Sequence, residues 1–422
     1  MIKALLLLGG ACLIATPASA ETLGDAVRAA YASNPTLAAA AARQAGLAQT
    51  VDQARAGGRL ALGADVSAGY DRFDYGKGGG AAVSADLPIW TGGRVRNAVL
   101  AAQGDVSAGE QALRDTRAAV LESVVTVFAD LLYDQQAVKI VEADIALLDN
   151  QVAEADARFA LGSSTRTDVA RLEAQVASAR ATRADAMANL AIDSATYLAT
   201  VGHAPGVLAD PVETLEGLPT TLDQAHARTL IGNPLYQQAR IAARGAAARI
   251  DVARSNGAPS VSLGGNYGYA ARLGSGGSYN RAATGGLTIH VPILTGGLVG
   301  AQVRQSRADF RAAQFDAEAA GREATRATDA AWALSISRQA QAAANAESVA
   351  AAETALKGVR AEYAFALRST LDILVADESL RGAELALARN RSDLLIAQAL
   401  LLRATGRLDG RAFAMAPSPR DE

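Results

Sequence analysis

The feature that most constrains the fold of this 422-residue chain is an internal duplication. The pair Asn-Pro occurs at 34–35 and again at 233–234, 199 residues later. The segment Pro-x-x-Thr-Gly-Gly occurs at 88–93 and again at 292–297, 204 residues later. One five-residue insertion within 273–279 accounts for the difference, and insertions collect at exposed loop tips. The chain is therefore predicted to hold two copies of one structural unit, with a hairpin tip at the insertion.

Each copy contains two segments in which apolar side chains alternate with polar ones, as in a β-strand. The segments lie at 59–73 and 83–89 in the first copy, and at 260–273 and 287–293 in the second. Strands of about 10 to 13 residues can cross a bilayer at a tilt, although a soluble sheet with one buried face gives the same alternation. The glycine-rich stretch 76–80 is predicted to be a flexible tip between two strands.

Four strands are too few to close a transmembrane barrel, because the smallest single-chain barrels have about eight. Open sheet edges in lipid would leave backbone donors and acceptors unpaired, at a cost of several kcal/mol each. If these strands face lipid, several chains must supply them. Two chains would give about eight strands and three would give about twelve.

Long helices are predicted after each strand pair. Apolar side chains follow a 4-3 spacing from Val120 to Phe159, interrupted only by Asp134, and again from Ile373 to Leu401. This spacing is typical of a left-handed coiled coil. A helix over 94–159 would be about 100 Å long, far more than a globular core needs. A periplasmic coiled-coil rod gives the same pattern, and the many helical carboxylates are expected to form a solvated face.

The turns from strand to helix are predicted from proline and glycine. Proline cannot donate to a sheet ladder, so it is expected to end the second strand of each copy. The Thr-Gly-Gly that follows permits a turn into the long helix. The predicted turn residues are Pro88, Gly92, Gly93, Pro292, Gly296 and Gly297.

The first twenty residues are typical of a secretory signal. Lys3 precedes an apolar run over 4–14, and Ala-Ser-Ala at 18–20 is a cleavage motif that places the mature start near Glu21. The apolar run is too short for a transmembrane anchor. The only cysteine, Cys12, lies inside this segment and lacks the upstream Leu of a lipoprotein signal, so lipidation is not expected. No later run of about 18 apolar residues predicts a spanning helix.

The sequence offers no catalytic or cofactor-binding constellation. His203, His226 and His290 have no second ligand at metal spacing, and no nucleophile elbow or phosphate-binding glycine loop occurs. The net charge is -3 and no Lys/Arg cluster stands out, so no nucleic-acid partner is expected. We therefore expect neither an enzyme, nor a cofactor, nor a metal site.

The duplicated unit, the two Pro-x-x-Thr-Gly-Gly segments and two helical-hairpin tips, at 158–169 and 362–374, together resemble the outer-membrane efflux (TolC) family over about residues 22–408. The resemblance implies a mixed fold of α-helices and transmembrane β-strands. Each chain gives four strands to a trimeric 12-strand outer-membrane barrel, which a periplasmic α-helical tunnel continues. The implied division is a signal peptide at 1–20, a first repeat at 21–202, a linker or equatorial segment at 203–221, a second repeat at 222–408 and a tail at 409–422.

The function that the resemblance implies is a passive outer-membrane channel of a tripartite export system. The homotrimer would take drugs, other small molecules or a type I secretion substrate from an inner-membrane pump of RND or ABC type. A periplasmic membrane-fusion adaptor would join channel and pump, and outer-membrane lipid would surround the barrel. The residues alone leave an alternative, a structural periplasmic coiled-coil protein without a channel.

The same resemblance assigns an entrance latch to the two tips. Tyr363 and Arg368 match the family residues that tie the inner hairpin to the outer one, whereas a second family aspartate falls at Val375 and is missing here. From the residues alone, Asp168 and Asp372 could instead cap the helices that follow them. The predicted latch comprises Thr167, Asp168, Tyr363, Arg368 and Asp372.

Overall fold

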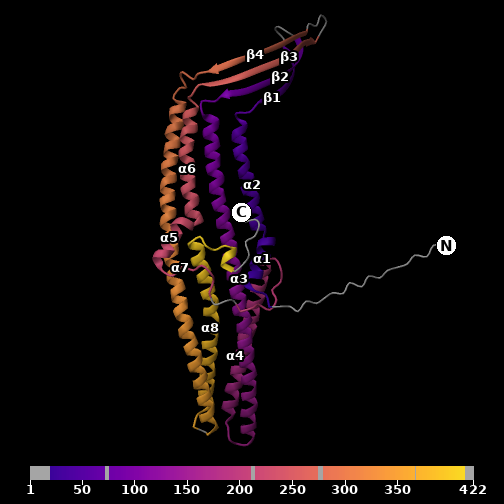
Figure 1. Ribbon diagram of the computed structural model, residues 1–422. Coiled ribbons are helices and arrows are strands. Elements are labelled where there is room, and N and C mark those ends of the chain that lie inside the picture. Colours follow the sequence, from indigo (N-terminus) through magenta and orange to yellow (C-terminus); the bar gives the residue numbers. More distant parts are fainter. Residues whose placement is uncertain (1–19, 72–75, 211–213, 274–278, 366, 414–422) are drawn as a thin grey trace, which may run out of the picture.

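The computed structural model describes residues 20–71, 76–210, 214–273, 279–365 and 367–413. Apart from Ala20, the predicted signal segment lies outside the described residues, and so does the centre of the predicted tip at 273–279. The molecule is elongated, with one β-sheet at one end and columns of helices running away from it (Figure 1). Two helical hairpin tips form the opposite end.

Two successive units with the same order of elements make up the chain, which confirms the predicted duplication. The first unit contains α1 (Leu23–Ser33), α2 (Pro35–Ala56), β1 (Ala61–Asp71), β2 (Gly76–Trp90), α3 (Arg94–Ala160) and α4 (Arg166–Val201). The second contains α5 (Leu222–Gly232), α6 (Pro234–Ser255), β3 (Ser260–Leu273), β4 (Tyr279–His290), α7 (Leu298–Ala364) and α8 (Thr370–Ala404), before the short 3-10 helix η1 (Gly410–Phe413).

Each unit opens with two helices before its strands. Asn34 ends α1 and begins α2 in an extended conformation, with φ -70° and ψ 117°. Its side-chain oxygen accepts a hydrogen bond from the backbone N–H of Thr36 at 2.9 Å. Pro35 then occupies the first helical position, where its missing N–H costs nothing. Asn233 and Pro234 repeat this break between α5 and α6.

The two longest helices set the length of the molecule. Both α3 and α7 have 67 residues, which corresponds to about 100 Å. They run from the sheet to the tips, beside α2 and α6 near the sheet and beside α4 and α8 near the tips (Figure 1). Among the described residues, no helix is long and apolar enough to cross a membrane.

The four strands form one antiparallel sheet in the order β1-β2-β3-β4. Its register places apolar side chains in rows, such as Leu87 beside Leu263 and Leu263 beside Leu287. Polar side chains form the intervening rows, such as Ser84 beside Asn266. These rows confirm the predicted alternation of the two faces.

Two details of the strand prediction are wrong. The stretch 76–80 is not a tip but the first part of β2, where Gly80 pairs with Ser67 on one side and Ala270 on the other. Pairing on both sides holds these glycines extended, and a Cβ on Gly80 would lie 3.1 Å from the Tyr269 carbonyl oxygen. Pro88 does not end β2, which continues through a register shift to Trp90.

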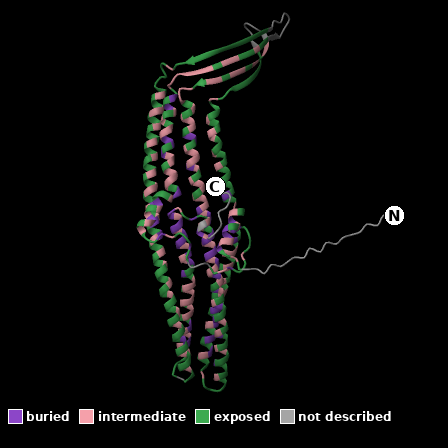
Figure 2. Cartoon of the chain, viewed as in Figure 1, coloured by how far each residue is buried: buried purple, intermediate pink, exposed green. Residues whose placement is uncertain are grey.

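No strand residue whose burial is described is buried, so the described part of the chain covers neither face of the sheet (Figure 2). Large apolar side chains are widely open, with Val66 85% exposed and Leu62 70% exposed. A sheet that used one face as its own soluble core would bury such side chains. The apolar face therefore needs a cover that the described residues of a single chain do not provide.

The main hydrophobic core lies at mid-length, where α1, α3, α4 and α8 meet (Figure 2). Phe128 on α3 and Tyr197 on α4 are among its largest fully buried side chains. Leu208 and Leu215, from the segment after α4, pack into the same core. Toward the tips the core narrows to seams between α3 and α4, and the predicted coiled-coil stripe ends before Phe159, which is 42% exposed.

Candidate functional site

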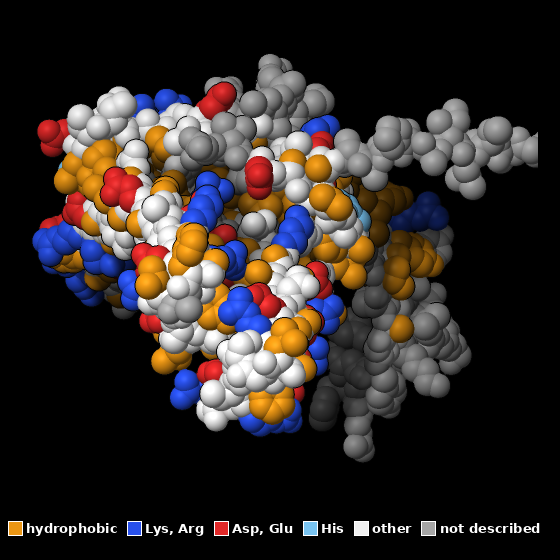
Figure 3. All heavy atoms as spheres, turned by 90° about the horizontal axis from the view of Figure 1, so that it is seen from below, with side chains coloured by type: hydrophobic (Ala, Val, Ile, Leu, Met, Phe, Trp, Pro, Cys, Tyr) orange, Lys and Arg blue, Asp and Glu red, His pale blue; other side chains and the backbone are white. Residues whose placement is uncertain are grey.

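The predicted latch residues lie on the two hairpin tips at the end of the molecule opposite the sheet (Figure 1). We name α3 with α4 the first hairpin, and α7 with α8 the second hairpin. Seen from below, this end carries interspersed acidic, basic and apolar side chains (Figure 3). The tips therefore present mixed chemistry and not a patch of one charge.

Both predicted aspartates belong to the capping box of the helix that follows their tip, at its third position, whereas Thr165 and Ser369 are the N-cap residues. The side chain of Asp168 accepts hydrogen bonds from the Thr165 hydroxyl at 2.7 Å and the Thr165 backbone N–H at 3.2 Å. Asp372 accepts from the Ser369 hydroxyl and backbone N–H, both at 2.8 Å. In return, the Thr165 and Ser369 hydroxyls accept the backbone N–H of the aspartates, which completes a capping box at each tip.

These hydrogen bonds lower the pKa of both aspartates. For Asp168 the Thr165 hydroxyl is the largest cause, and for Asp372 it is the Ser369 backbone N–H. Donors that favour the carboxylate stabilise its ionised form. Both side chains are therefore negatively charged caps at the positive ends of α4 and α8.

The other predicted latch residues make contacts inside their own tip. The Nε of Arg368 lies 2.6 Å from Oε2 of Glu362, and the hydroxyl of Tyr363 lies 3.5 Å from that of Thr370. Thr167 is exposed in the first turn of α4. Within this single chain, the described tip contacts do not bring Tyr363 or Arg368 to Thr167 or Asp168.

The ends of the two hairpins meet through a residue that the sequence reading did not single out. The guanidinium carbon of Arg158, in the last turn of α3, lies 4.6 Å from the centroid of the Tyr363 ring on α7. Glu154 pairs with the same arginine at 2.6 Å and orients it. A cation over an aromatic face is attractive, so this contact joins the first tip to the second.

Farther from the tips, arginines of α8 reach carboxylates of α3. Arg381 contacts Asp144 at 2.8 Å, and Arg389 contacts Asp130 at 2.8 Å. Arg403 contacts Glu122 at 2.5 Å and, more distantly, Asp115. Charged hydrogen bonds thus connect the two hairpins along most of α8.

Several helical carboxylates are buried, so the expected solvated acidic face is wrong for them. Asp144 on α3 and Asp377 on α8 are hydrogen-bonded to each other. Burial, reinforced by Asp144, raises the pKa of Asp377 to about 7. Asp134 on α3 is likewise buried beside Asp193 on α4, and burial raises its pKa to about 7. In the sequence, Asp134 was evident only as an interruption of the 4-3 apolar spacing.

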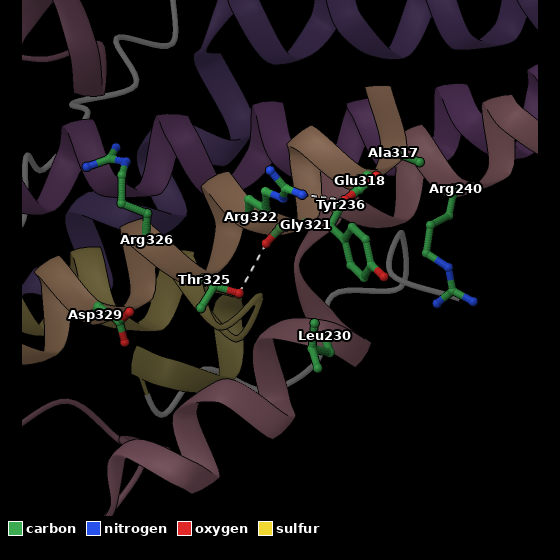
Figure 4. Close-up of a pocket in the computed structure, with 10 residues that line it drawn as sticks. All are labelled: Leu230, Tyr236, Arg240, Ala317, Glu318, Gly321, Arg322, Thr325, Arg326 and Asp329. Carbon is green, nitrogen blue, oxygen red and sulfur yellow. Dashed lines mark hydrogen bonds and ion pairs between the residues drawn. The ribbon is translucent and has the colours of Figure 1, made fainter. Parts of the chain in front are cut away.

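An open groove of about 640 Å³ lies where α5 and α6 meet α7 (Figure 4). Its acidic and basic side chains are largely paired with each other, as with Arg322 and Glu318 at 2.5 Å. His226 contacts Asp329 at 2.5 Å, and Arg240 stacks over the Tyr236 ring. This charge balance favours no class of ligand.

The described residues contain no group of three or more His, Cys, Asp or Glu side chains placed to hold a metal ion. Of the three histidines, His203 lies 3.3 Å from Glu21 and His226 contacts Asp329. His290 is the last residue of β4.

The strand-to-helix turns differ between the units. Gly92 and Gly296 have left-handed φ of 60° and 58°. A Cβ on Gly92 would lie 2.5 Å from the Ala258 Cβ and 2.8 Å from the Pro259 oxygen, so the turn packs tightly on the second unit. The equivalent space around Gly296 is open.

Comparison with known proteins by sequence identifies a family and one relative. The family model described as outer membrane efflux protein matches residues 26–203 and 226–407. The chain is 29% identical to the outer membrane efflux protein BepC of Brucella suis biovar 1 (strain 1330), across 97% of this chain and 90% of BepC.

Two solved structures have a similar fold. The outer membrane protein VceC of Vibrio cholerae is matched with a TM-score of 0.75 and 24% identity, over 91% of this chain and 96% of VceC. The open state of the MtrE outer membrane channel of Neisseria gonorrhoeae is matched with a TM-score of 0.75 and 21% identity, over 91% of this chain and 88% of MtrE.

Proposed function

This chain belongs to the outer membrane efflux protein family, and from that premise we propose that it forms the outer-membrane channel of a tripartite export system. It lies in the outer membrane, with its helices in the periplasm. The observation that carries the proposal is a four-stranded sheet, whose two edges and apolar face the described residues leave open, attached to helices about 100 Å long. A barrel shared between copies pairs the edges, and lipid covers the apolar face.

Three copies give the smallest assembly that agrees with the family fold. They bring together twelve strands, with β4 of one copy beside β1 of the next. The turns support this arrangement, because the tight contact of Gly92 with residues 258–259 has no counterpart at Gly296 within the chain. By the 199-residue repeat, residues 59–60 of the next copy would supply it.

The helices then form the wall of a tunnel. Within one chain, α3 is flanked by α2 and α4 on one side and by α6 and α8 on the other, and α7 packs beside α6 and α8. The free sides of this curved layer are α7 and the α2–α4 column, and closing them against neighbouring copies gives a continuous wall. We propose the repeats 21–202 and 222–408 as its building units, with segment 203–221 as part of a belt at mid-length.

The channel itself is a passive duct and does no chemistry. An inner-membrane pump of RND or ABC type supplies the energy, and a periplasmic membrane-fusion adaptor links the pump to the hairpin tips. The polar rows of the sheet, such as Ser84 and Asn266, face the lumen. Substrates pass without a specific binding site.

The tips form the entrance, and Thr167, Asp168, Tyr363, Arg368 and Asp372 remain our candidates for its latch. Inside one chain Asp168 and Asp372 serve as caps. Their remaining acceptor capacity, and the exposed guanidinium of Arg368, are available to the neighbouring copy. Repeated three times around the entrance, such contacts would form a latch with a closed and an open state.

Single-channel conductance of the purified full-length chain in planar bilayers tests the function. We expect discrete conductance steps, and a mass in detergent that corresponds to three copies. A stable monomer without conductance would overturn the proposal. Release of the protein by osmotic shock, without detergent, would instead favour a periplasmic coiled-coil rod.

A further inference from the structure

The contact between Asp144 and Asp377 has a chemistry that the tip latch does not use. Asp144 lies on α3 of the first hairpin and Asp377 on α8 of the second, so their hydrogen bond crosses between the hairpins. Their side chains are only 6% and 9% exposed. Two carboxyl groups can hydrogen-bond to each other only if a proton lies between them.

The contact lies close to the entrance. Asp377 follows the cap residue Asp372 by five positions, which is about 7 to 8 Å along α8. One turn closer to the tip, Leu374 packs against the seams that hold α3 to α4. Asp144 and Asp377 therefore lie next to the apolar contact through which the second hairpin packs against the first.

Charged groups on α7 and α8 surround the pair. On α8, Arg381 reaches Asp144 at 2.8 Å, and on α7, Arg360 reaches Asp377 at 3.5 Å. Burial first, then Glu353 on α7 and last Asp144 raise the pKa of Glu384 on α8.

The remaining charged side chains near the pair contact groups other than Asp144 and Asp377. Glu378 on α8 is mostly exposed and lies 3.9 Å from Arg381. On α7, Glu353 pairs with Lys357 at 3.7 Å. On α4, the helix that packs on the other side of α3, Arg180 pairs with Asp149 and Arg183 with Glu142. The two arginines of the cluster, Arg360 and Arg381, are therefore the cations that face the pair.

We propose that Asp144 and Asp377 form a proton-dependent clasp that holds the second hairpin against the first, and that loss of the shared proton favours separation of the hairpins and opening of the entrance. The effect on opening rests on the proposed channel function, whereas the effect on the hairpins does not. Arg360 and Arg381 stabilise the ionised pair enough to keep it folded, but they do not remove the preference of a buried acid for its neutral form.

The direction of the pH effect follows from the two states of Asp377. In the closed contact it keeps its proton up to about pH 7. In a separated, hydrated state it would release the proton near its ordinary pKa of 3.8. The closed contact is therefore fully favoured below about pH 4 and weakens as the pH rises toward 7. One linked proton changes the closed-to-open ratio by at most about tenfold per pH unit.

The test measures the distance between the tips and, separately, the current. Spin labels are attached to Leu161→Cys and Leu367→Cys, two exposed positions on different tips. Cys12, the only native cysteine, lies in the predicted signal segment and is replaced by Ser if the mature chain retains it. Labelled chains are diluted into unlabelled assemblies, so that each measured distance arises within one chain. Distances are recorded from pH 4.5 to 8, and conductance is recorded over the same range.

We expect the fraction of long inter-tip distances to rise at least about threefold across this range in the parent chain. Asp377→Asn and Asp144→Asn keep the size and hydrogen-bonding capacity of the pair but remove a titrating group, and should make the distance independent of pH. Arg360→Gln removes a cation that favours the ionised state, and should move the transition to higher pH. Asp134→Asn is the matched control, because its partner Asp193 lies on α4 of the same hairpin; it should leave the inter-tip response unchanged.

A pH-dependent distance that persists in Asp377→Asn and Asp144→Asn would overturn the clasp, as would a parent distance that does not respond to pH. If Asp377→Asn fails to assemble, the test uses Arg360→Gln. An inter-tip distance that changes at the same pH in Arg360→Gln as in the parent chain would contradict the clasp. A pH-dependent distance without any conductance would refute the channel and leave the clasp standing. Conductance together with an inter-tip distance that does not respond to pH would refute the clasp and leave the channel standing.

Discussion

Arg158 at the end of α3 lies over the ring of Tyr363 at the end of α7, with 4.6 Å between the guanidinium carbon and the ring centroid. This pair binds the first tip to the second by the face of an aromatic ring. The Tyr363 hydroxyl contributes little, since its nearest partner, Thr370, is 3.5 Å away and in the same tip. The geometry therefore separates the role of the ring from the role of the hydroxyl.

Tyr363→Leu should loosen the tips, whereas Tyr363→Phe should leave them nearly unchanged. An exposed cation–π contact contributes about 0.5 to 1 kcal/mol, or a factor of about 2 to 5 in the closed-to-open ratio. Single-channel recordings of the two variants measure this ratio. A large rise in the open fraction of Tyr363→Phe would contradict this prediction and show that the hydroxyl, and not only the ring, holds the tips together.

Ser369→Ala should fray the first turn of α8. The substitution removes the hydroxyl that accepts the Asp372 backbone N–H at 3.3 Å and donates to the Asp372 carboxylate. Loss of an N-cap side chain costs about 0.5 to 2 kcal/mol. Hydrogen exchange should accelerate at residues 370–373 and stay unchanged at the α4 start, where Thr165 caps independently. Unchanged protection in α8 would contradict the capping role.

Gly92→Ala and Gly296→Ala form a matched pair that tests the assembly. Both place a Cβ on a left-handed residue, which costs about 1 to 2 kcal/mol. Only Gly92→Ala adds a clash within the chain, 2.5 Å from the Ala258 Cβ. In the dissociated chain, Gly92→Ala should therefore be the more destabilising change.

In the assembled state the two variants should differ less in stability, because residues 59–60 of the next copy would also clash with a Cβ on residue 296. Native mass spectrometry across a detergent series measures how readily each variant dissociates. If Gly296→Ala dissociates like the parent chain, the proposed contact between copies is wrong.

Asp134→Asn should flatten the pH dependence of stability. Burial first, and then Asp193, raises the pKa of Asp134 to about 7, whereas the unfolded chain releases this proton near 3.9. The folded state thus binds more protons between these values. The contribution of Asp134 is fully favourable below about pH 4, falls as the pH rises toward 7 and is constant above it.

Thermal unfolding of parent and Asp134→Asn at pH 4.5 and pH 8 checks this prediction. We expect the stability difference between the two proteins to change by about 1 to 3 kcal/mol across the range, in favour of the variant at high pH. Comparing the two proteins cancels the opposite slope from Asp168 and Asp372, whose pKa values are lowered. A constant difference would refute the raised pKa.

The periodic parts of the fold could be predicted from the sequence because their signals are local. The strand alternation and the repeated Pro-x-x-Thr-Gly-Gly segments each depend on a few neighbouring residues. The stretch 76–80 could not, because glycine favours a tip locally and is extended here only through pairing with both β1 and β3.

The site was less predictable, because its contacts join residues far apart in the chain. Asp144 and Asp377 are 233 positions apart, and each alone is typical of a solvated helix face. Only the packing of α8 on α3 shows that they share a buried position. Arg158 is part of the first tip segment, but its stacking on Tyr363 depends on how the two hairpins pack against each other.

The two halves of the chain have the same plan but no longer the same side chains. By the 204-residue repeat, Arg158 in the first tip corresponds to Glu362 in the second, so these equivalent positions carry opposite charges. Three copies would place six such positions, alternately basic and acidic, around the entrance. Six identical positions would make six identical contacts, whereas alternating basic and acidic positions make two kinds of contact, so that one set of three hairpins can move while the other set stays in place.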